Sequence, residues 1–287
     1  MEKYPKVFIV ILNYDRKDRL KKCLDSVFQI AYPNFEVVIV DNNSSDGSLE
    51  MVRTGYSRST LIKNEANLGY SAGNNVGIRY ALERMADYVL LLNNDTEVKA
   101  NFLSRLIEVA EGNAKIGILS PLIFDGYSGK VWFSGGEIDW MKMKAINLSE
   151  IKHENNFSTD FISGCAMLVK KDVFKKIGLL DEDFFLYWED VDFSLRAKRS
   201  GFKIGVAVSS WIDHFERKEG SGSSKAYWLV LSGLLFFKKN SKGLMKFWIV
   251  FYTCLRRLKN MIDVGFIKTE TSKSVQKAYG DFERKKN

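Results

Sequence analysis

The stretch that decides the fold is Tyr88-Val-Leu-Leu-Leu-Asn-Asn-Asp-Thr-Glu-Val98, in which an apolar run ends in two amides and a carboxylate. Because residues 89–92 are all apolar, both faces of this strand should be covered, as in a parallel sheet wrapped by helices. In such sheets ligands bind beyond the carboxyl ends of the strands, which is where Asn93, Asn94 and Asp95 fall. An aspartate in this position is often only a turn or cap residue, so the neighbouring segments must decide its role.

Two earlier segments repeat the pattern of an apolar strand that ends in polar side chains. Residues 6–12 are apolar and β-branched and lead into Asn13-Tyr14-Asp15-Arg16. Residues 35–40 form a second such run, which leads into Asp41-Asn-Asn-Ser-Ser-Asp-Gly-Ser48. Helical patterns separate these strands and a shorter one at residues 59–62, so the order up to Val98 is β-α-β-α-β-α-β. This order predicts a doubly wound α/β domain.

The turn after the first strand lacks the glycines through which dinucleotide folds approach a pyrophosphate. A dehydrogenase, or a nucleotidyltransferase with a Gly-rich phosphate loop, is therefore disfavoured. Asp41 is placed to accept hydrogen bonds from a ribose or a base, although the polar run 41–48 also suits an ordinary βα turn. The small residues 69–75 would let a helix begin close to a ligand, or they form only a tight connection.

A second group of carboxylates opens a predicted helix, in the sequence Trp188-Glu-Asp-Val-Asp192. Carboxylates in a first turn suit the helix dipole, which explains part of the pattern without any catalytic role. An aromatic run at residues 184–188 stands directly beside them. Because apolar walls raise the pKa of a carboxylate and aromatic faces suit a sugar ring, this segment indicates a pocket for a general base and an acceptor saccharide.

The composition is that of an ordinary globular protein, with 46% hydrophobic and 27% charged residues in 287. The three cysteines are odd in number and lack metal-ligand spacing, which favours a reducing compartment. With no pattern typical of a secretion signal, we expect a cytoplasmic protein. The net charge of +8 is concentrated in residues 216–287, which carry 16 Lys and Arg against 6 Asp and Glu.

Taken together, these motifs resemble the family-2 nucleotide-sugar glycosyltransferases with the glycosyltransferase-A fold, especially their rhamnosyltransferase-like branch. The resemblance covers roughly residues 6–240 and rests on six ordered segments: 13–16, 41–48, 67–75, 92–96, 160–169 and 178–196. It implies an α/β fold with a Rossmann-like mixed sheet, helices on both faces and additional C-terminal helices. We expect a nucleotide-sugar-binding half at 1–98, an acceptor-binding and catalytic half of the same domain at 99–224, and a basic helical extension at 225–287.

The resemblance also assigns roles to individual residues. Asp190 would be the catalytic base, with Glu189 beside it. The acceptor would be bound by Trp188, Tyr187 and Gly164. Contacts with the nucleotide-sugar donor would come from residues that follow the first strands: Asn13, Tyr14, Arg16, Asp41, Asn43, Asn67, Gly69, Asn74, Asn94 and Asp95.

A divalent cation, Mg²⁺ or Mn²⁺, is the cofactor that the resemblance implies, with Asp95 and His214 as its ligands. Asn93 and Asn94 stand where the family commonly has further aspartates, so Asp95 is the one charged ligand of the triplet. A lone histidine is more often structural, and only the resemblance favours a metal role for His214. Residues 216–224, rich in glycine and serine, are interpreted as a mobile segment that orders over the bound donor.

The function implied is inverting transfer of a sugar from a UDP- or dTDP-sugar, with rhamnose as the leading candidate. The acceptor would be a saccharide or lipid-linked saccharide in cell-surface polysaccharide synthesis. The alternative is a catalytically inactive module that binds nucleotide sugars or saccharides at the membrane surface, which the presence of Asp95, Asp190 and His214 disfavours. Nucleic acid is not an expected partner, because the basic residues form no base-stacking motif outside the tail.

The basic tail predicts two helices, at residues 227–237 and 244–262. Neither apolar run reaches the roughly 20 residues needed to span a bilayer. The second helix is basic and amphipathic, which suits peripheral binding to the inner face of the plasma membrane. Packing on the catalytic domain, or on a second subunit in a homodimer, explains the pattern equally well. Residues 268–287 are expected to be frayed.

Overall fold

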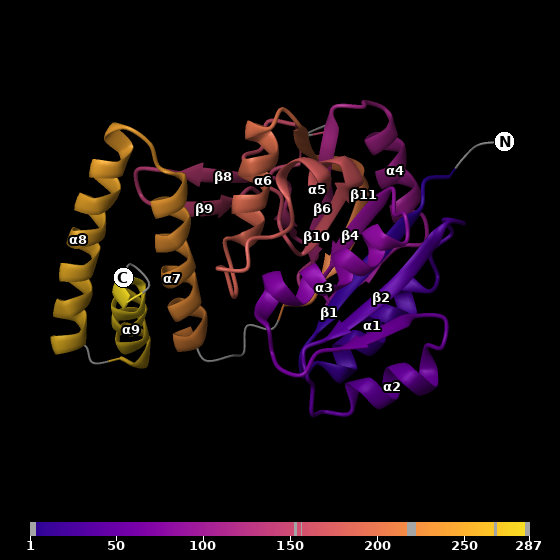
Figure 1. Cartoon of the computed structure of the whole chain (residues 1–287), viewed down its shortest axis with the longest axis horizontal. Helices are drawn as coiled ribbons and strands as arrows, with labels where there is room; N and C mark the ends of the chain where they lie inside the picture. Colours follow the sequence, from indigo (N-terminus) through magenta and orange to yellow (C-terminus); the bar gives the residue numbers. More distant parts are fainter. Residues whose placement is uncertain (1–3, 152–153, 156, 217–221, 267–268, 285–287) are drawn as a thin grey trace.

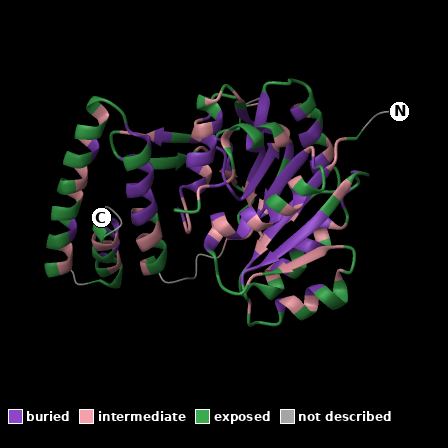
Figure 2. Ribbon diagram, in the orientation of Figure 1, coloured by how far each residue is buried: buried purple, intermediate pink, exposed green. Residues whose placement is uncertain are grey.

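The computed structural model describes residues 4–151, 154–155, 157–216, 222–266 and 269–284. A mixed sheet with helices on both faces forms the body of the molecule, and three C-terminal helices stand beside it (Figure 1). The strands through the middle of the sheet are buried along most of their length, whereas the outer helices expose one side (Figure 2). The predicted α/β class with a mixed sheet is confirmed.

The first part of the chain alternates strands and helices in the predicted order. The elements are β1 (Val7–Asn13), α1 (Lys17–Val27), β2 (Phe35–Asp41), α2 (Ser48–Gly55), β3 (Thr60–Lys63), α3 (Gly69–Glu83) and β4 (Tyr88–Leu92). These four strands are parallel and lie in the order β3-β2-β1-β4. Asn13 pairs with Asp41 in the register of β1 and β2, so the polar residues that end both strands lie side by side.

The second part completes the sheet and brings in its antiparallel members. Its elements are β5 (Thr96–Val98), α4 (Phe102–Glu111), β6 (Ile116–Asp125), β7 (Val131–Phe133), β8 (Gly136–Asp139), β9 (Lys144–Asn147), β10 (Ala166–Lys170), α5 (Lys171–Ile177), α6 (Glu189–Arg199) and β11 (Lys203–His214). The path across the sheet is β3-β2-β1-β4-β10-β6-β11-β5, with β7 paired to β6. Beside this sheet, β8 and β9 form a separate hairpin.

The reversed direction of β10 determines where the site is built. This strand lies between β4 and β6 and is antiparallel to both. Its first residue, Ala166, pairs with Leu92, the last residue of β4. The segment just before β10 therefore meets the segment just after β4, which brings Gly164 to the edge of the sheet that also carries Asp95.

The tail consists of α7 (Gly222–Asn240), α8 (Leu244–Phe266) and α9 (Glu270–Arg284). The expectation that residues 268–287 are frayed is wrong for the part that α9 covers. Ala278, Tyr279 and Phe282 on α9 are buried, and the hydroxyl of Tyr227 donates to Asp281 over 2.7 Å. These apolar residues recur at helical spacing, and α7 supplies the partner that covers them. In the part of the chain that the structure describes, no helix has the length and apolar character needed to cross a membrane.

Candidate functional site

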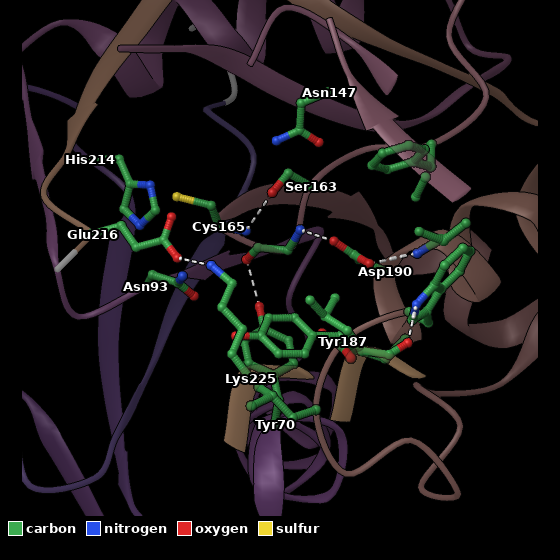
Figure 3. A pocket seen from close by; sticks show the side chains of 18 of the residues that line it. Tyr70, Asn93, Asn147, Ser163, Cys165, Tyr187, Asp190, His214, Glu216 and Lys225 are labelled. Carbon is green, nitrogen blue, oxygen red and sulfur yellow. Dashed lines mark hydrogen bonds and ion pairs between the residues drawn. The ribbon is translucent and has the colours of Figure 1, made fainter. Parts of the chain in front are cut away.

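A cavity of about 910 Å³ opens beyond the ends of β4 and β11, between the start of α6 and the start of α7. Many of the residues expected to form the site line it: Arg16, Asp95, Gly164, Tyr187, Trp188, Glu189, Asp190 and His214. His214 and Glu216 lie on one side of the pocket, and Asp190 lies on the other (Figure 3). The cavity therefore separates the expected metal ligand from the expected base.

On the metal side, Nε2 of His214 lies 3.2 Å from Oδ1 of Asp95. Neither this oxygen nor Nδ1 of His214 makes a hydrogen bond of good geometry within the described residues, although both atoms are buried. Burial raises the pKa of Asp95, but the adjacent imidazole outweighs it and holds the pKa below its ordinary value. For His214 burial lowers the pKa, whereas the neighbouring Cys165 and Asp95 raise it above the ordinary value. Oδ1 of Asp95 therefore faces the imidazole, whereas the buried Nδ1 of His214 lacks a hydrogen bond of good geometry among the described residues.

On the opposite side, α6 begins with the two adjacent carboxyl groups of Glu189 and Asp190. Asp190 accepts hydrogen bonds from the backbone N–H groups of Gly164 and Val191, both over 2.8 Å. Burial raises the pKa of Asp190, and these two N–H groups oppose the rise. Burial and the Asp190 carboxylate raise the pKa of Glu189 much further, and its buried Oε2 has no partner among the described residues. We therefore expect Asp190 to be the carboxylate and Glu189 the neutral acid of the pair.

The backbone just before α6 is strained, since two consecutive non-glycine residues take left-handed conformations. Tyr187 has φ 66° and Trp188 has φ 71°. Trp188 is fixed by its indole N–H, which donates to the carbonyl oxygen of Leu229 over 3.1 Å, and by ring contacts with Phe236 and Phe237. Strain of this kind persists only where surrounding contacts hold it, and it is concentrated at functional sites. The contacts from α7 therefore hold the start of α6, with its two carboxyl groups, in place.

Of the expected donor residues, only Arg16 and Asp95 line the cavity. Next to the cavity, Asn13 donates to Asp41 over 3.0 Å and accepts from Asn94 over 2.8 Å. Asp41 also accepts from the backbone N–H and the hydroxyl of Ser44. These bonds join the ends of β1, β2 and β4 into one polar edge.

The remaining expected donor residues lie further along this edge. Tyr14 and Asn43 are exposed. The side-chain oxygen of Asn67 accepts from the N–H of Gly69, and the side chain of Asn74 donates to the carbonyl oxygen of Tyr70 within α3. Of the segment expected to be mobile, residues 217–221 lie outside the described residues, and 222–224 begin α7.

Three further residues line the cavity and were not among the individually predicted site residues. Tyr70 donates from its hydroxyl to the carbonyl oxygen of Gly164 over 2.5 Å. The ring of Trp132 meets the imidazole of His214 edge-on, with centroids 4.6 Å apart. Lys225 forms an ion pair with Glu216 over 2.7 Å at the rim. The contacts of Tyr70 and Trp132 join segments far apart in the sequence, so no local pattern predicts them.

Gly69 is a position where the site depends on a glycine. Its φ is +78°, and a Cβ atom there would lie 2.5 Å from the carbonyl oxygen of Phe185. Gly69→Ala should lower the free energy of unfolding by about 2 to 3 kcal/mol, because it combines a left-handed backbone with a clash against another backbone. Urea titration followed by circular dichroism measures the effect. Gly55→Ala is the control, since a Cβ there meets nothing within 4 Å; an equal loss in both variants would contradict this account.

The sequence from residue 8 to residue 178, well over half of the chain, matches the model for glycosyl transferase family 2. The chain belongs to glycosyltransferase family 2. The predicted resemblance is thereby confirmed at the level of the family, and the matched region contains β1 to β10 and the Asp95 segment.

The chain is similar in sequence to a named hexosyltransferase and to a named rhamnosyltransferase. The low-salt glycan biosynthesis hexosyltransferase Agl10 of Haloferax volcanii is 30% identical over 210 residues, which are 69% of this chain and 63% of Agl10. This chain therefore spans less than two thirds of that relative. The N-acetylglucosaminyl-diphospho-decaprenol L-rhamnosyltransferase of Mycobacterium tuberculosis is 26% identical over 227 residues, covering 70% of this chain and 73% of the relative.

Among solved structures, the mannosyltransferase PcManGT from Pyrobaculum calidifontis, in complex with GDP-Man and Mn²⁺, superposes with a TM-score of 0.63. The alignment covers 97% of this chain and 76% of PcManGT at 15% sequence identity. At this level of identity the similarity shows the fold alone. The expected glycosyltransferase-A fold of this family-2 chain is confirmed.

Proposed function

We propose that this family-2 member is an inverting, metal-dependent glycosyltransferase. The observation that carries the proposal is the cavity itself, with the Asp95–His214 pair on one side and Asp190 on the other. An inverting transfer by a single displacement needs the base and the leaving group on opposite sides of the anomeric carbon, because the nucleophile approaches from the side opposite the leaving group. With the donor diphosphate near Asp95 and the acceptor hydroxyl near Asp190, the two would lie on opposite sides of the cavity.

The proton balance assigns the chemical role of Asp190. The acceptor oxygen forms a bond to the anomeric carbon, the bond from this carbon to the diphosphate oxygen breaks, and the hydroxyl proton passes to the Asp190 carboxylate. The N–H groups of Gly164 and Val191 orient this carboxylate and oppose the rise of its pKa that burial causes. Tyr70 supports the arrangement, because its hydroxyl binds the carbonyl oxygen of the same Gly164. Tyr187 and Trp188 would form the apolar wall beside the acceptor sugar.

The residues present fit a divalent cation held by Asp95 and His214. Ligands at about 2.1 Å in an octahedral shell lie about 3 Å from each other, close to the 3.2 Å between Oδ1 of Asp95 and Nε2 of His214. A bound Mg²⁺ or Mn²⁺ would offset the negative charge that gathers on the departing diphosphate. No cluster of three metal-binding side chains occurs within the described ranges. Diphosphate oxygens and water would therefore complete the shell, as is usual for Mg²⁺.

For the substrates, we propose a UDP- or dTDP-sugar donor, with rhamnose as the leading candidate, and a saccharide or lipid-linked saccharide acceptor of cell-surface polysaccharide synthesis. The support is the similarity to the mycobacterial N-acetylglucosaminyl-diphospho-decaprenol L-rhamnosyltransferase. Agl10, which acts as a hexosyltransferase in glycan biosynthesis, supports the wider class.

The test is release of nucleoside diphosphate by the purified chain across a panel of nucleotide sugars, with and without EDTA. Release from one donor that is abolished by EDTA and restored by Mn²⁺ is the expected result, and it names the sugar. If no donor releases nucleoside diphosphate, calorimetric titration with UDP and dTDP distinguishes a missing acceptor from a site that does not bind nucleotide. Tight, metal-dependent binding would indicate that only the acceptor is lacking, whereas no binding of either nucleotide would overturn the proposal.

A further inference from the structure

Helix α8 presents large apolar side chains to solvent, which is unusual for a helix that also packs on a globular core. Only Ile249 and Asn260 of this helix are buried. Its solvent-facing side carries a group of exposed, large apolar side chains, which we call the α8 apolar face: Leu244, Phe247, Val250, Phe251, Leu255, Leu258, Met261, Ile262 and Phe266. Figure 2 shows this helix as the outermost layer of the molecule, exposed along most of its length.

Helix geometry gathers these side chains into a single stripe. At 3.6 residues per turn, they fall within an arc of about 160°, and Ile249 and Asn260 lie on the opposite side. No charged residue of α8 falls within that arc. A helix at the surface of a protein normally presents its polar side to solvent. An exposed apolar stripe therefore indicates a surface that binds an apolar partner.

The charges at the margins of the stripe indicate what the partner is. Lys246 and Arg257 follow one margin and Lys259 follows the other, while Asp263 is the one acidic residue of α8. Arg257 forms an ion pair with Glu283 of α9, so, among the described residues, the two lysines carry the unpaired charge of these margins. Basic residues that border a wide apolar stripe fit the surface of an anionic bilayer, where the stripe enters the acyl region and the cations meet headgroups. A second copy of this chain would instead bring the same basic margins against each other. Charge complementarity therefore favours lipid.

We propose that α8 lies in the plane of an anionic membrane surface, with the α8 apolar face buried among the acyl chains. At 23 residues the helix would offer a long contact parallel to the membrane. This arrangement makes the protein peripheral to the membrane.

Two elements connect α8 with the cavity. The indole N–H of Trp248 on α8 donates to the carbonyl oxygen of Met141 in the turn between β8 and β9, over 3.0 Å. Ala145 and Asn147 on β9 line the cavity, as does Lys225 on α7. The elements that support α8 therefore also form the cavity wall, which suits an acceptor saccharide anchored in the same bilayer. This extension to the acceptor rests on the proposed function, whereas membrane binding by α8 does not.

The test is co-sedimentation of the full chain with phosphatidylcholine vesicles that contain phosphatidylglycerol. The wild type should bind, and the double variant Phe247→Glu, Phe251→Glu should bind at least about tenfold more weakly, because two buried aromatic side chains are lost. Lys246→Gln and Lys259→Gln should each weaken binding to these vesicles roughly fivefold and leave binding to pure phosphatidylcholine unchanged.

Met85→Glu is the matched control, since Met85 is 77% exposed and Phe247 is 76% exposed, but Met85 lies after α3. This variant should bind vesicles like the wild type. Absence of wild-type binding, or equal binding by the double variant, would overturn the inference. Light scattering compares the oligomeric states of the two proteins. If the wild type is a dimer and the double variant is a monomer, the α8 apolar face binds a second copy of the chain, and the membrane proposal is overturned. Nucleotide binding in the cavity is measured without vesicles, so failure here is distinct from failure of the proposed function.

Discussion

Replacing Asp190 with asparagine should reduce the rate of sugar transfer by roughly 10²- to 10⁴-fold, which is the contribution expected of a general base. The amide keeps the size of the side chain, and its one oxygen can still accept from the N–H of Gly164, although the bond from the N–H of Val191 is lost. The pocket should therefore largely keep its shape. What is lost is the capacity to take the acceptor proton. Donor binding should be unchanged, because Asp190 lies across the cavity from Asp95 and His214. Initial rates at saturating donor, with calorimetric titration of the nucleotide, measure both quantities.

Glu189→Gln is the comparison that makes this prediction specific. Burial and the adjacent Asp190 raise the pKa of Glu189 well above its ordinary value, so the substitution replaces a neutral acid with a neutral amide. The transfer rate should therefore fall far less than in Asp190→Asn. The opposite ranking, with Glu189→Gln inactive and Asp190→Asn active, would make Glu189 the base. Both variants should melt close to the wild type, which thermal unfolding checks.

Replacing Asp95 with asparagine should reduce transfer at least about 100-fold, because a metal ion supplies several kcal/mol of charge stabilisation to the departing diphosphate. Asn93 and Asn94 precede it, so this change would leave no carboxylate in the triplet. The affinity for Mn²⁺ in the presence of nucleoside diphosphate should fall in parallel. Titration of Mn²⁺ by electron paramagnetic resonance measures the affinity directly, without dependence on turnover. His214→Ala should act in the same direction.

Asp213→Asn provides the control for this loss of charge. Asp213 is the neighbour of His214 in β11, but its carboxylate forms an ion pair with Lys99 over 2.8 Å at the surface. Its removal should leave Mn²⁺ affinity and transfer rate within about twofold of the wild type, as expected for a surface ion pair of small energy. Asp95→Asn with full, EDTA-insensitive activity would rule out the metal role.

The parallel half of the fold was predictable because each strand carries its own signal. The apolar runs at 6–12, 35–40 and 88–92 end in polar clusters, and the helical patterns between them leave few alternatives for the order of elements. β7, β8 and β9 are too short to give a clear strand pattern in the sequence, and none of them was predicted. The helix α9 was missed because it has few apolar residues. Their helical spacing can be recognised as a packing face only when the position of α7, which covers them, is known.

The site was predictable in its residue types and less so in its geometry. The carboxylates Asp95, Glu189 and Asp190 follow recognisable strand and helix boundaries. Tyr70 and Gly164 come together only because β10 runs antiparallel beside β4, and no periodicity encodes the direction of a strand. The left-handed backbone at Tyr187 and Trp188 is likewise imposed from outside, by contacts from α7.

The position of β10 also governs how the protein can be made. In the finished sheet, β4 pairs with β1 on one side and with β10 on the other. When the nascent chain has reached Val98, β10 has not yet been made. The backbone N–H and C=O groups on one edge of β4 are then unpaired, and the side chains of this strand are apolar. Such open edges recruit other chains and promote aggregation. Residues 1–98 should consequently be insoluble when expressed alone, and on the ribosome they should depend on chaperones until β10 emerges and pairs with β4.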